Sequence, residues 1–218
     1  MQGSVPNMPL RVLQTTFVAP MTSAATRIDA RILRVGKSNA HVEARISAGA
    51  ELVAIVVGVF GAGRLSEVHL SPQQPAVAIE AAPGVREPSG SLPAFLQHFA
   101  LRWRRGSPPG ARSAATSSVV DASFHDAGRA TEEHVVALAD AVPPHALSML
   151  KRSAFGSSLT WTLEMLRAGD VAGLSLDDWR LDVDLLAADA GYTSQSVMVW
   201  GPDGRAVALS RQCMVVFG

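Results

Sequence analysis

Three polar residues occupy positions where the surrounding sequence favours apolar side chains. Asp140 stands at the C-terminal end of a helix-type segment, where the helix dipole disfavours an anion. Gln212 lies in the middle of a strand-type segment, and Ser158 begins another. A carboxylate can take a proton from water, while a hydroxyl and a carboxamide can hold that water. The three types can therefore perform hydrolysis together, although each also fits an ordinary role as a helix-terminal Asp, a strand Ser and an edge Gln.

The strands that would carry two of these residues follow from the apolar pattern. Three apolar-rich segments near the C-terminus predict strands: 179–189, 192–200 and 205–217. The turn signal at 201–204, Gly-Pro-Asp-Gly, joins the last two into a hairpin, because Pro and Gly suit its backbone angles. A period of two then places Gln212 on one face with Ser210 and Met214.

One segment, 131–142, predicts an α-helix. Thr131 can cap it, and Glu132 and Glu133 follow where the helix dipole favours anions. Its apolar residues share one face: Val135, Leu138, Ala139 and Val142. Two prolines after Val142 end the helix, so Asp140 falls in its last turn.

The strand pattern occurs twice in the chain. One copy runs from Arg27 to Gly61 and the other from Arg180 to Gly218. The first copy also has strand-type segments, at 10–20, 27–35, 40–46 and 51–60. We expect the additional residues of the second copy to lie in its longer hairpin turn. The chain is thus predicted to contain two copies of one antiparallel unit.

The repeat predicts which apolar residues correspond to the polar ones. Counting back from the C-terminal Phe of each copy pairs Gln212 with Ile55, and Ser158 pairs with Leu10. Positions that are apolar in one copy and polar in the other indicate that the second copy is specialised.

Composition excludes several classes of protein. The 218 residues are 48% hydrophobic and 17% charged, with no net charge, which argues against disorder and against a nucleic-acid partner. The longest apolar run, 52–60, is too short to span a membrane. The single cysteine and the six histidines lack the spacing of metal ligands. We therefore expect a cytoplasmic protein with no membrane span, no metal and no cofactor.

The order of elements predicts an α+β fold. A curved antiparallel sheet wrapped round one helix is the hotdog arrangement, and two copies make a double hotdog. We expect a first hotdog at 1–63, a proline-rich linker at 64–94 and a second hotdog at 95–218, whose first strand starts near Phe95. The first hotdog lacks its N-terminal strand and helix. This leaves an apolar face that an additional N-terminal segment, a partner's element or a swapped dimer is expected to cover.

The sequence resembles the acyl-CoA thioesterase II family of double-hotdog hydrolases along essentially its whole length. The stretches that carry the resemblance are T-T-F-V-A-P, R-I-D-A-R-I-L-R-V-G-K-S-N-A-H-V-E-A-R-I, A-L-A-D-A-V-P-P, S-S-L-T-W-T-L-E-M-L-R and D-G-R-A-V-A-L-S-R-Q. The family activates water with an Asp, a Ser or Thr, and a Gln. The resemblance assigns these roles to Asp140, Ser158 and Gln212. The chain departs from the family in the missing front of the first hotdog.

The resemblance implies a thioesterase that hydrolyses acyl-CoA in fatty acid metabolism by direct attack of water. We expect cations near turns to meet the CoA phosphates, with Arg34, Lys37 and Arg205 as candidates. We also expect a homo-oligomer, a dimer of double hotdogs. The alternative is a non-catalytic hotdog that binds acyl groups or serves as a dimerisation scaffold, which would not need the three polar residues.

Overall fold

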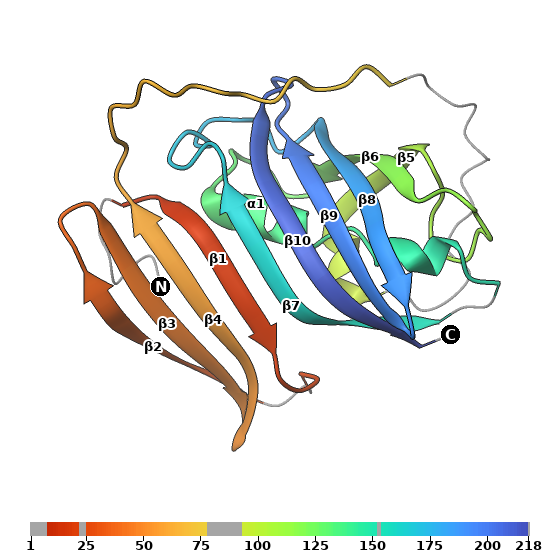
Figure 1. Cartoon of the computed structure of the whole chain (residues 1–218), viewed down its shortest axis with the longest axis horizontal. Helices are drawn as coiled ribbons and strands as arrows, with labels where there is room; N and C mark the ends of the chain where they lie inside the picture. The colour runs from red at the N-terminus through yellow and green to blue at the C-terminus, as the bar shows by residue number, and fades with distance from the viewer. Residues whose placement is uncertain (1–7, 22–24, 78–92, 152–153, 218) are drawn as a thin grey trace.

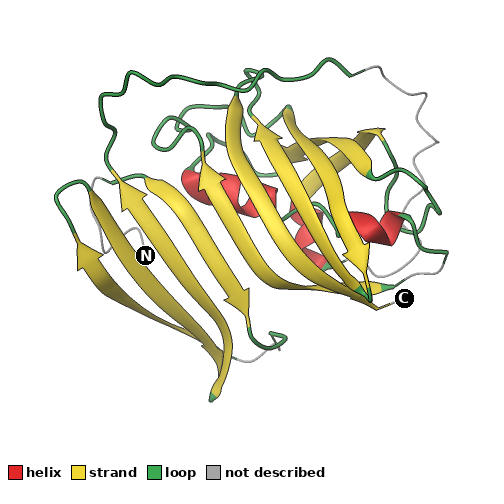
Figure 2. Cartoon of the chain, in the orientation of Figure 1, coloured by secondary structure: helices red, strands yellow, loops and turns green. Residues whose placement is uncertain are grey.

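The computed structural model describes residues 8–21, 25–77, 93–151 and 154–217. Ten antiparallel strands form one sheet in the order β2-β3-β4-β1-β7-β10-β9-β8-β6-β5 (Figures 1 and 2). The first four strands are β1 Leu10–Phe17, β2 Thr26–Val35, β3 Asn39–Ala48 and β4 Glu51–Gly61. The other strands are β5 Phe99–Arg105, β6 Ser117–Phe124, β7 Phe155–Met165, β8 Trp179–Asp189, β9 Tyr192–Trp200 and β10 Ala206–Phe217. The helices are α1 Glu132–Ala139 and the 3₁₀ helices η2 Ala94–His98 and η3 His145–Ser148.

The two predicted sheets are joined edge to edge by β1 and β7, which pair from Val12 with Glu164 to Thr16 with Thr160. On either side of this seam the order is the same, with β4, β3 and β2 beyond β1 and β10, β9 and β8 beyond β7. Within the described residues, only the second half continues into β6 and β5 and carries α1, which packs against β10 and β9 (Figure 2). The predicted double hotdog with a shortened first copy is confirmed, while the domain boundaries stay a prediction.

Irregularities in strand pairing align the two halves residue by residue. Among the described residues, the four strands β1–β4 and their counterparts β7–β10 each contain three β-bulges, where one strand carries an extra residue. The extra residues are Arg11 on β1, Leu33 on β2 and Val53 on β4, and Leu159 on β7, Leu186 on β8 and Val207 on β10. Since each bulge recurs on the equivalent strand, they fix which residues correspond.

This alignment corrects one correspondence drawn from the sequence. Ser158 corresponds to Leu10, as predicted, but Gln212 corresponds to Gly58 and not to Ile55. The prediction placed all additional residues in the hairpin turn. The turn has two residues in the first copy, Gly49 and Ala50, and three in the second, 202–204. The remaining additional residues lengthen β10 at its end, so counting back from the last Phe shifted the comparison to the opposite face.

The helix is shorter than predicted, because α1 ends at Ala139. Thr131 is the N-cap, and its backbone N–H donates to Nδ1 of His134 at 3.1 Å. The predicted apolar face is buried against the sheet. Asp140 is the C-cap residue. The segment at 94–98, predicted as the start of a strand, is the 3₁₀ helix η2, so β5 begins only at Phe99.

Glu132 fastens the start of α1 to both halves of the sheet. Its carboxylate accepts the backbone N–H of Leu10, at 3.2 and 3.0 Å for its two oxygens. It also accepts the N–H of Gly169 at 3.2 Å. A buried carboxylate satisfied by backbone donors holds its position firmly, so the helix is registered against β1 and against the loop after β7.

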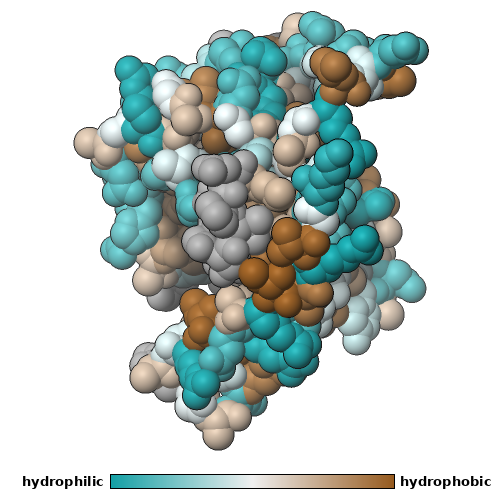
Figure 3. Space-filling view, turned by 90° about the vertical axis from the view of Figure 1, so that its left-hand side faces the viewer, coloured by the Kyte–Doolittle hydropathy of each residue, from teal (hydrophilic) through white to brown (hydrophobic). Residues whose placement is uncertain are grey.

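Strand β2 forms an exposed edge of the sheet. All ten of its residues are exposed, and within the described chain it pairs only with β3. The pairing places Ile28, Ile32 and Val35 on the face of Val42, and they are 64%, 48% and 60% exposed. Figure 3 faces this side and shows apolar groups among charged ones. On this face Val42 is buried, whereas its cross-strand partner Ile32 is exposed.

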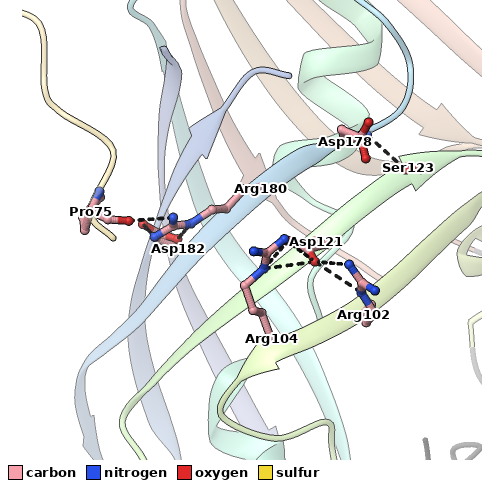
Figure 4. A network of polar contacts seen from close by, with 8 residues as sticks. All are labelled: Pro75, Arg102, Arg104, Asp121, Ser123, Asp178, Arg180 and Asp182. Atoms are coloured by element: carbon pink, nitrogen blue, oxygen red, sulfur yellow. Dashed lines mark hydrogen bonds and ion pairs between the residues drawn. The ribbon is translucent and has the colours of Figure 1, made fainter. Parts of the chain in front are cut away.

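The segment after β4 is tied to the second half from the face opposite α1. The Arg180 guanidinium donates to the carbonyl oxygen of Pro75 at 2.7 Å and pairs with Asp182 at 2.6 Å (Figure 4). Nearby, Asp121 accepts from Arg102 and Arg104. One carboxylate thus offsets part of the charge of these two arginines. No helix within the described segments is long and apolar enough to cross a membrane.

Candidate active site

Asp140 and Gln212 meet beneath the C-terminal end of α1. Gln212 Nε2 donates to Asp140 Oδ1 at 2.5 Å, although 72 residues separate them. Gln212 is 4% exposed, whereas Asp140 is accessible from an adjoining pocket. Protein atoms around the Asp140 carboxyl desolvate it and raise its pKa, while the hydrogen bond from Gln212 partly opposes that rise. A carboxylate with a raised pKa that water can reach is suited to act as a general base.

Two residues that the sequence analysis did not assign hold Asp140 over Gln212. The indole N–H of Trp161 donates to Ser210 Oγ at 2.8 Å. The Ser210 hydroxyl in turn donates to the carbonyl oxygen of Ala139 at 3.5 Å. These bonds tie the last turn of α1 to β7 and β10. The alternation of strand residues could have identified them. Ser210 lies two residues before Gln212 on the same face of β10, and Trp161 is the cross-strand partner of Gln212 on β7.

Ser158 faces the same side of the sheet as Gln212. It pairs with Met214, two residues beyond Gln212 on β10, so it is a diagonal neighbour of Gln212. The bulge at Leu159 keeps Ser158 and Trp161 on one face despite their odd spacing. Ser158 is half-buried, and no hydrogen bond between it and Asp140 or Gln212 is seen in the described chain. The structure therefore brings two of the three residues into contact and the third alongside.

A pocket of about 520 Å³ opens beside Asp140. Its apolar wall is largely aromatic and comprises Phe95, Phe99, Phe124, Val136, Ala137 and Trp161. The polar residues that line it are His98, Asp126, Glu133, His134 and Asp140. The rings of Phe99 and Phe124 lie 5.0 Å apart, and His134 meets Phe124 edge-on at 5.0 Å. A pocket of this size and lining suits an apolar group of a small molecule.

Of the three cations proposed for the CoA phosphates, Arg34 and Lys37 lie at one hairpin and Arg205 lies apart from them. Arg34 and Lys37 are at the end of β2 and in the turn before β3, with four strands between β2 and β10. Arg205 follows the turn between β9 and β10 and lies 3.7 Å from Asp170. Their role stays a prediction.

Two histidines near the helix have fixed positions in the structure. His145 is buried, and His134 takes part in the N-cap. In the ranges that the structure describes, no three or more His, Cys, Asp or Glu side chains are grouped to hold a metal ion.

The model of the acyl-CoA thioesterase C-terminal domain family matches residues 74–216. The chain belongs to the acyl-CoA thioesterase family. It is accordingly a thioester hydrolase, as the resemblance implied. The match contains Asp140, Ser158, Gln212 and the pocket residues. No curated protein matches the sequence.

Solved structures with the same fold cover nearly the whole thioesterase chain. A conserved hot dog fold protein from Alicyclobacillus acidocaldarius is 22% identical, with a TM-score of 0.80 over 98% of this chain and 81% of that one. The tesB protein of Mycobacterium avium subs paratuberculosis is 11% identical, with a TM-score of 0.79 over 99% and 82%. The acyl-CoA thioesterase II TesB2 of Mycobacterium marinum is 16% identical, with a TM-score of 0.72 over 97% and 82%. These likenesses confirm the hotdog architecture.

Proposed function

We propose that the protein hydrolyses acyl-CoA to a free acid and CoA, with Asp140 as the general base for a water molecule. The observation that carries the proposal is the contact between Asp140 and Gln212 at the wall of an apolar pocket. A raised pKa makes the carboxylate a stronger base than an ordinary aspartate. Ser158, on the same face, is assigned to orient the water.

The reaction proceeds by direct attack of water on the thioester carbonyl. Gln212 engages Asp140 Oδ1, so Oδ2 is assigned to take the proton as the water oxygen bonds to the carbonyl carbon. The tetrahedral intermediate then collapses by breaking the carbon–sulfur bond. The proton held by Asp140 passes to the departing thiolate, which leaves as the CoA thiol. No covalent acyl-enzyme forms in this sequence.

The acyl group is assigned to the aromatic part of the pocket. Phe99, Phe124 and Trp161 offer apolar surface beside Asp140, so an acyl chain placed there brings its carbonyl to the carboxylate. The phosphates of CoA then lie outside the pocket, where we assign them to Arg34, Lys37 or Arg205. With acyl-CoA as the substrate, we assign the protein to fatty acid metabolism and to the cytoplasm.

The alternative is a hotdog that binds acyl groups or acts as a scaffold without catalysis. Such a protein gains nothing from a partly desolvated carboxylate, because the charge weakens both apolar binding and folding. The raised pKa of Asp140 therefore favours catalysis.

Release of free thiol from a panel of acyl-CoA thioesters tests the proposed activity. The panel contains straight-chain, branched and aromatic acyl groups, and calorimetric binding is measured for each. We expect thiol release above the blank rate for at least one class. Binding without hydrolysis across the panel would reject the enzyme and support the scaffold.

We further propose that a second copy of the chain covers the β2 edge. Antiparallel pairing of two β2 strands about Ala30 places Asp29 opposite the second copy's Arg31 and Ile28 opposite its Ile32. This register is complementary in both charge and hydrophobicity. Exposed, unpaired strand edges favour such association.

Light scattering of the purified protein tests this dimer. We expect the mass of two chains, and a monomer for Ile32→Lys, because a lysine would be forced against an apolar side chain. Lys37→Glu, beyond the paired segment, is the matched control and should remain dimeric. A monomeric wild-type protein would contradict the dimer without bearing on catalysis.

A further inference from the structure

A second group of buried polar side chains lies directly behind the Asp140–Gln212 pair. Gln195 on β9 is the cross-strand partner of Gln212 and is 1% exposed. Its Oε1 accepts the backbone N–H of His145 at 2.7 Å. This bond holds the Gln195 carboxamide in one orientation, in which its NH₂ group faces away from the His145 N–H.

The His145 side chain is itself fixed, which makes it a firm support. Nε2 lies 2.9 Å from the carbonyl oxygen of Ala115, which can only accept, so Nε2 carries a proton. In the neutral ring Nδ1 then accepts from the hydroxyl of Ser118 at 3.2 Å. A buried histidine bonded at both ring nitrogens holds the start of η3 against β6 and the residues before it.

Three polar atoms around this contact are buried without a hydrogen-bond partner in the described chain. They are Gln195 Nε2, Thr193 Oγ1 and Ser148 Oγ. Thr193 lies two residues from Gln195 on the same face of β9, and Ser148 lies one 3₁₀ turn after His145 on η3. Buried polar groups of this kind are usually satisfied by ordered water, which makes about three hydrogen bonds.

The first half of the chain shows that the fold does not require these polar groups. By the bulge alignment, Gln195 corresponds to Val42 and Thr193 corresponds to Ala40. Both equivalents are apolar and fully buried. Gln212 likewise corresponds to Gly58. The two glutamines therefore replace apolar positions together, in adjacent strands of the half that carries Asp140.

We propose that Gln195 is a positioning residue whose buried NH₂ group, through an ordered water molecule, holds the Gln212 carboxamide turned toward Asp140. The inference rests on the proposed thioesterase function for its kinetic consequence. The NH₂ group of Gln212 donates to Asp140, so its Oε1 is left to accept a hydrogen bond. If the Gln195 NH₂ group donates to that oxygen through the water, the Gln212 carboxamide cannot turn its oxygen toward the Asp140 carboxylate.

The kinetic test compares Gln195→Met with Gln212→Met and with the double variant. At neutral pH, Gln195→Met is expected to lower kcat about 10-fold to 100-fold, as small misplacements do, and to change KM less than about twofold. Val199→Ala, a cavity variant further along β9, is the matched control for a purely structural loss. It should leave kcat and the pH profile unchanged.

The pH profile separates positioning from destabilisation. Gln212 lowers the pKa of Asp140, so Gln195→Met and Gln212→Met should both move the acid side of the kcat/KM profile to higher pH. The double variant should move it no further than Gln212→Met. The other titratable groups around Asp140 are His98, Asp126, Glu133 and His134, with His145 behind Gln195. All variants retain these groups, so differences between profiles exclude them. An unshifted profile for Gln195→Met, or additive shifts, would overturn the proposal.

A measurement that does not depend on thioester hydrolysis tests the role of Gln195 separately from the proposed thioesterase function. Exchange of the Gln212 side-chain NH₂ protons, followed by NMR, should be slow in the wild type. It should be at least about tenfold faster in Gln195→Met, because the carboxamide is then free to turn. Equal exchange rates would overturn the role of Gln195. A wild type without thiol release but with slow, Gln195-dependent exchange would reject only the thioesterase function.

Discussion

The carboxamide nitrogen of Gln212 lies 2.5 Å from Oδ1 of Asp140, across 72 residues of chain. One residue ends a helix and the other lies in the middle of a strand. The contact forms because Trp161 and Ser210 tie the last turn of α1 to the sheet. Because Gln212 holds Oδ1, the other oxygen of the Asp140 carboxylate, Oδ2, stays free to take a proton.

Replacing Asp140 with Asn should raise the stability of the folded protein at neutral pH. The pKa of Asp140 is raised on folding, chiefly by desolvation. A group with a raised pKa contributes stability below its ordinary pKa of 3.8 and loses it as the pH rises through the folded value. Urea unfolding should therefore show the variant at least as stable as wild type at pH 7, with the difference shrinking as the pH falls through the raised pKa and absent below about 3.8. A variant that is less stable at pH 7 would contradict this reading.

Removing the hydroxyl of Ser158 should slow hydrolysis without weakening substrate binding. We expect Ser158→Ala to lower kcat roughly 10-fold, since a misoriented water reacts less often, and Ser158→Thr to retain most activity. Steady-state kinetics with the best acyl-CoA of the panel measure both variants. Equal kcat for Ala and wild type would remove Ser158 from the site.

Glu132 should be the more important of two adjacent acidic residues for stability. Its carboxylate accepts the backbone N–H groups of Leu10 and Gly169, whereas Glu133 lines the open pocket. Glu132→Gln should cost about 1.5–3 kcal/mol in the free energy of unfolding, the range for hydrogen bonds to charged groups. Glu133→Gln is the matched control: its exposed carboxylate accepts a hydrogen bond from Thr131 at the N-cap, so the variant should lose less than about 1 kcal/mol. Equal losses would show that the bonds to Leu10 and Gly169 contribute nothing specific.

The CoA-phosphate assignment predicts an effect on KM alone. Neutralising a true phosphate contact among Arg34, Lys37 and Arg205 should raise KM about threefold to tenfold and leave kcat unchanged. The increase should shrink at high salt, because exposed charges are screened. Unchanged KM values for Arg34→Gln, Lys37→Gln and Arg205→Gln would reject all three.

The strands and the carboxylate–carboxamide pair could be predicted from the sequence, because alternation and helix spacing determine which faces meet. The strands around Gln212 and the turn before β10 lie where the apolar period and the Gly-Pro-Asp-Gly signal place them. Asp140 was recognisable because a carboxylate at a helix end breaks a local rule.

Other features depend on register and tertiary contacts that no local pattern contains. The additional residues at the end of β10 displace a count made from the last Phe, so the true equivalent of Gln212, Gly58, can be found only from the pairing of the strands. The burial of His145 and its bond to Gln195 arise from the path of the chain after α1. The pocket draws residues from several elements, and its aromatic wall includes Phe95, in a segment predicted as strand.

The most direct test of the proposed chemistry is thiol release by Asp140→Asn compared with the wild type, using the acyl-CoA that the wild type hydrolyses fastest. Asn keeps the size of the side chain and can still bond to Gln212, but it cannot take a proton. We expect turnover to fall about 10²–10⁴-fold, the usual effect of removing a general base. Calorimetric binding of the acyl-CoA should stay within about threefold of wild type, which shows that the fold and pocket persist. A turnover rate of the variant close to that of the wild type would mean that another residue is the base and would contradict the proposed site.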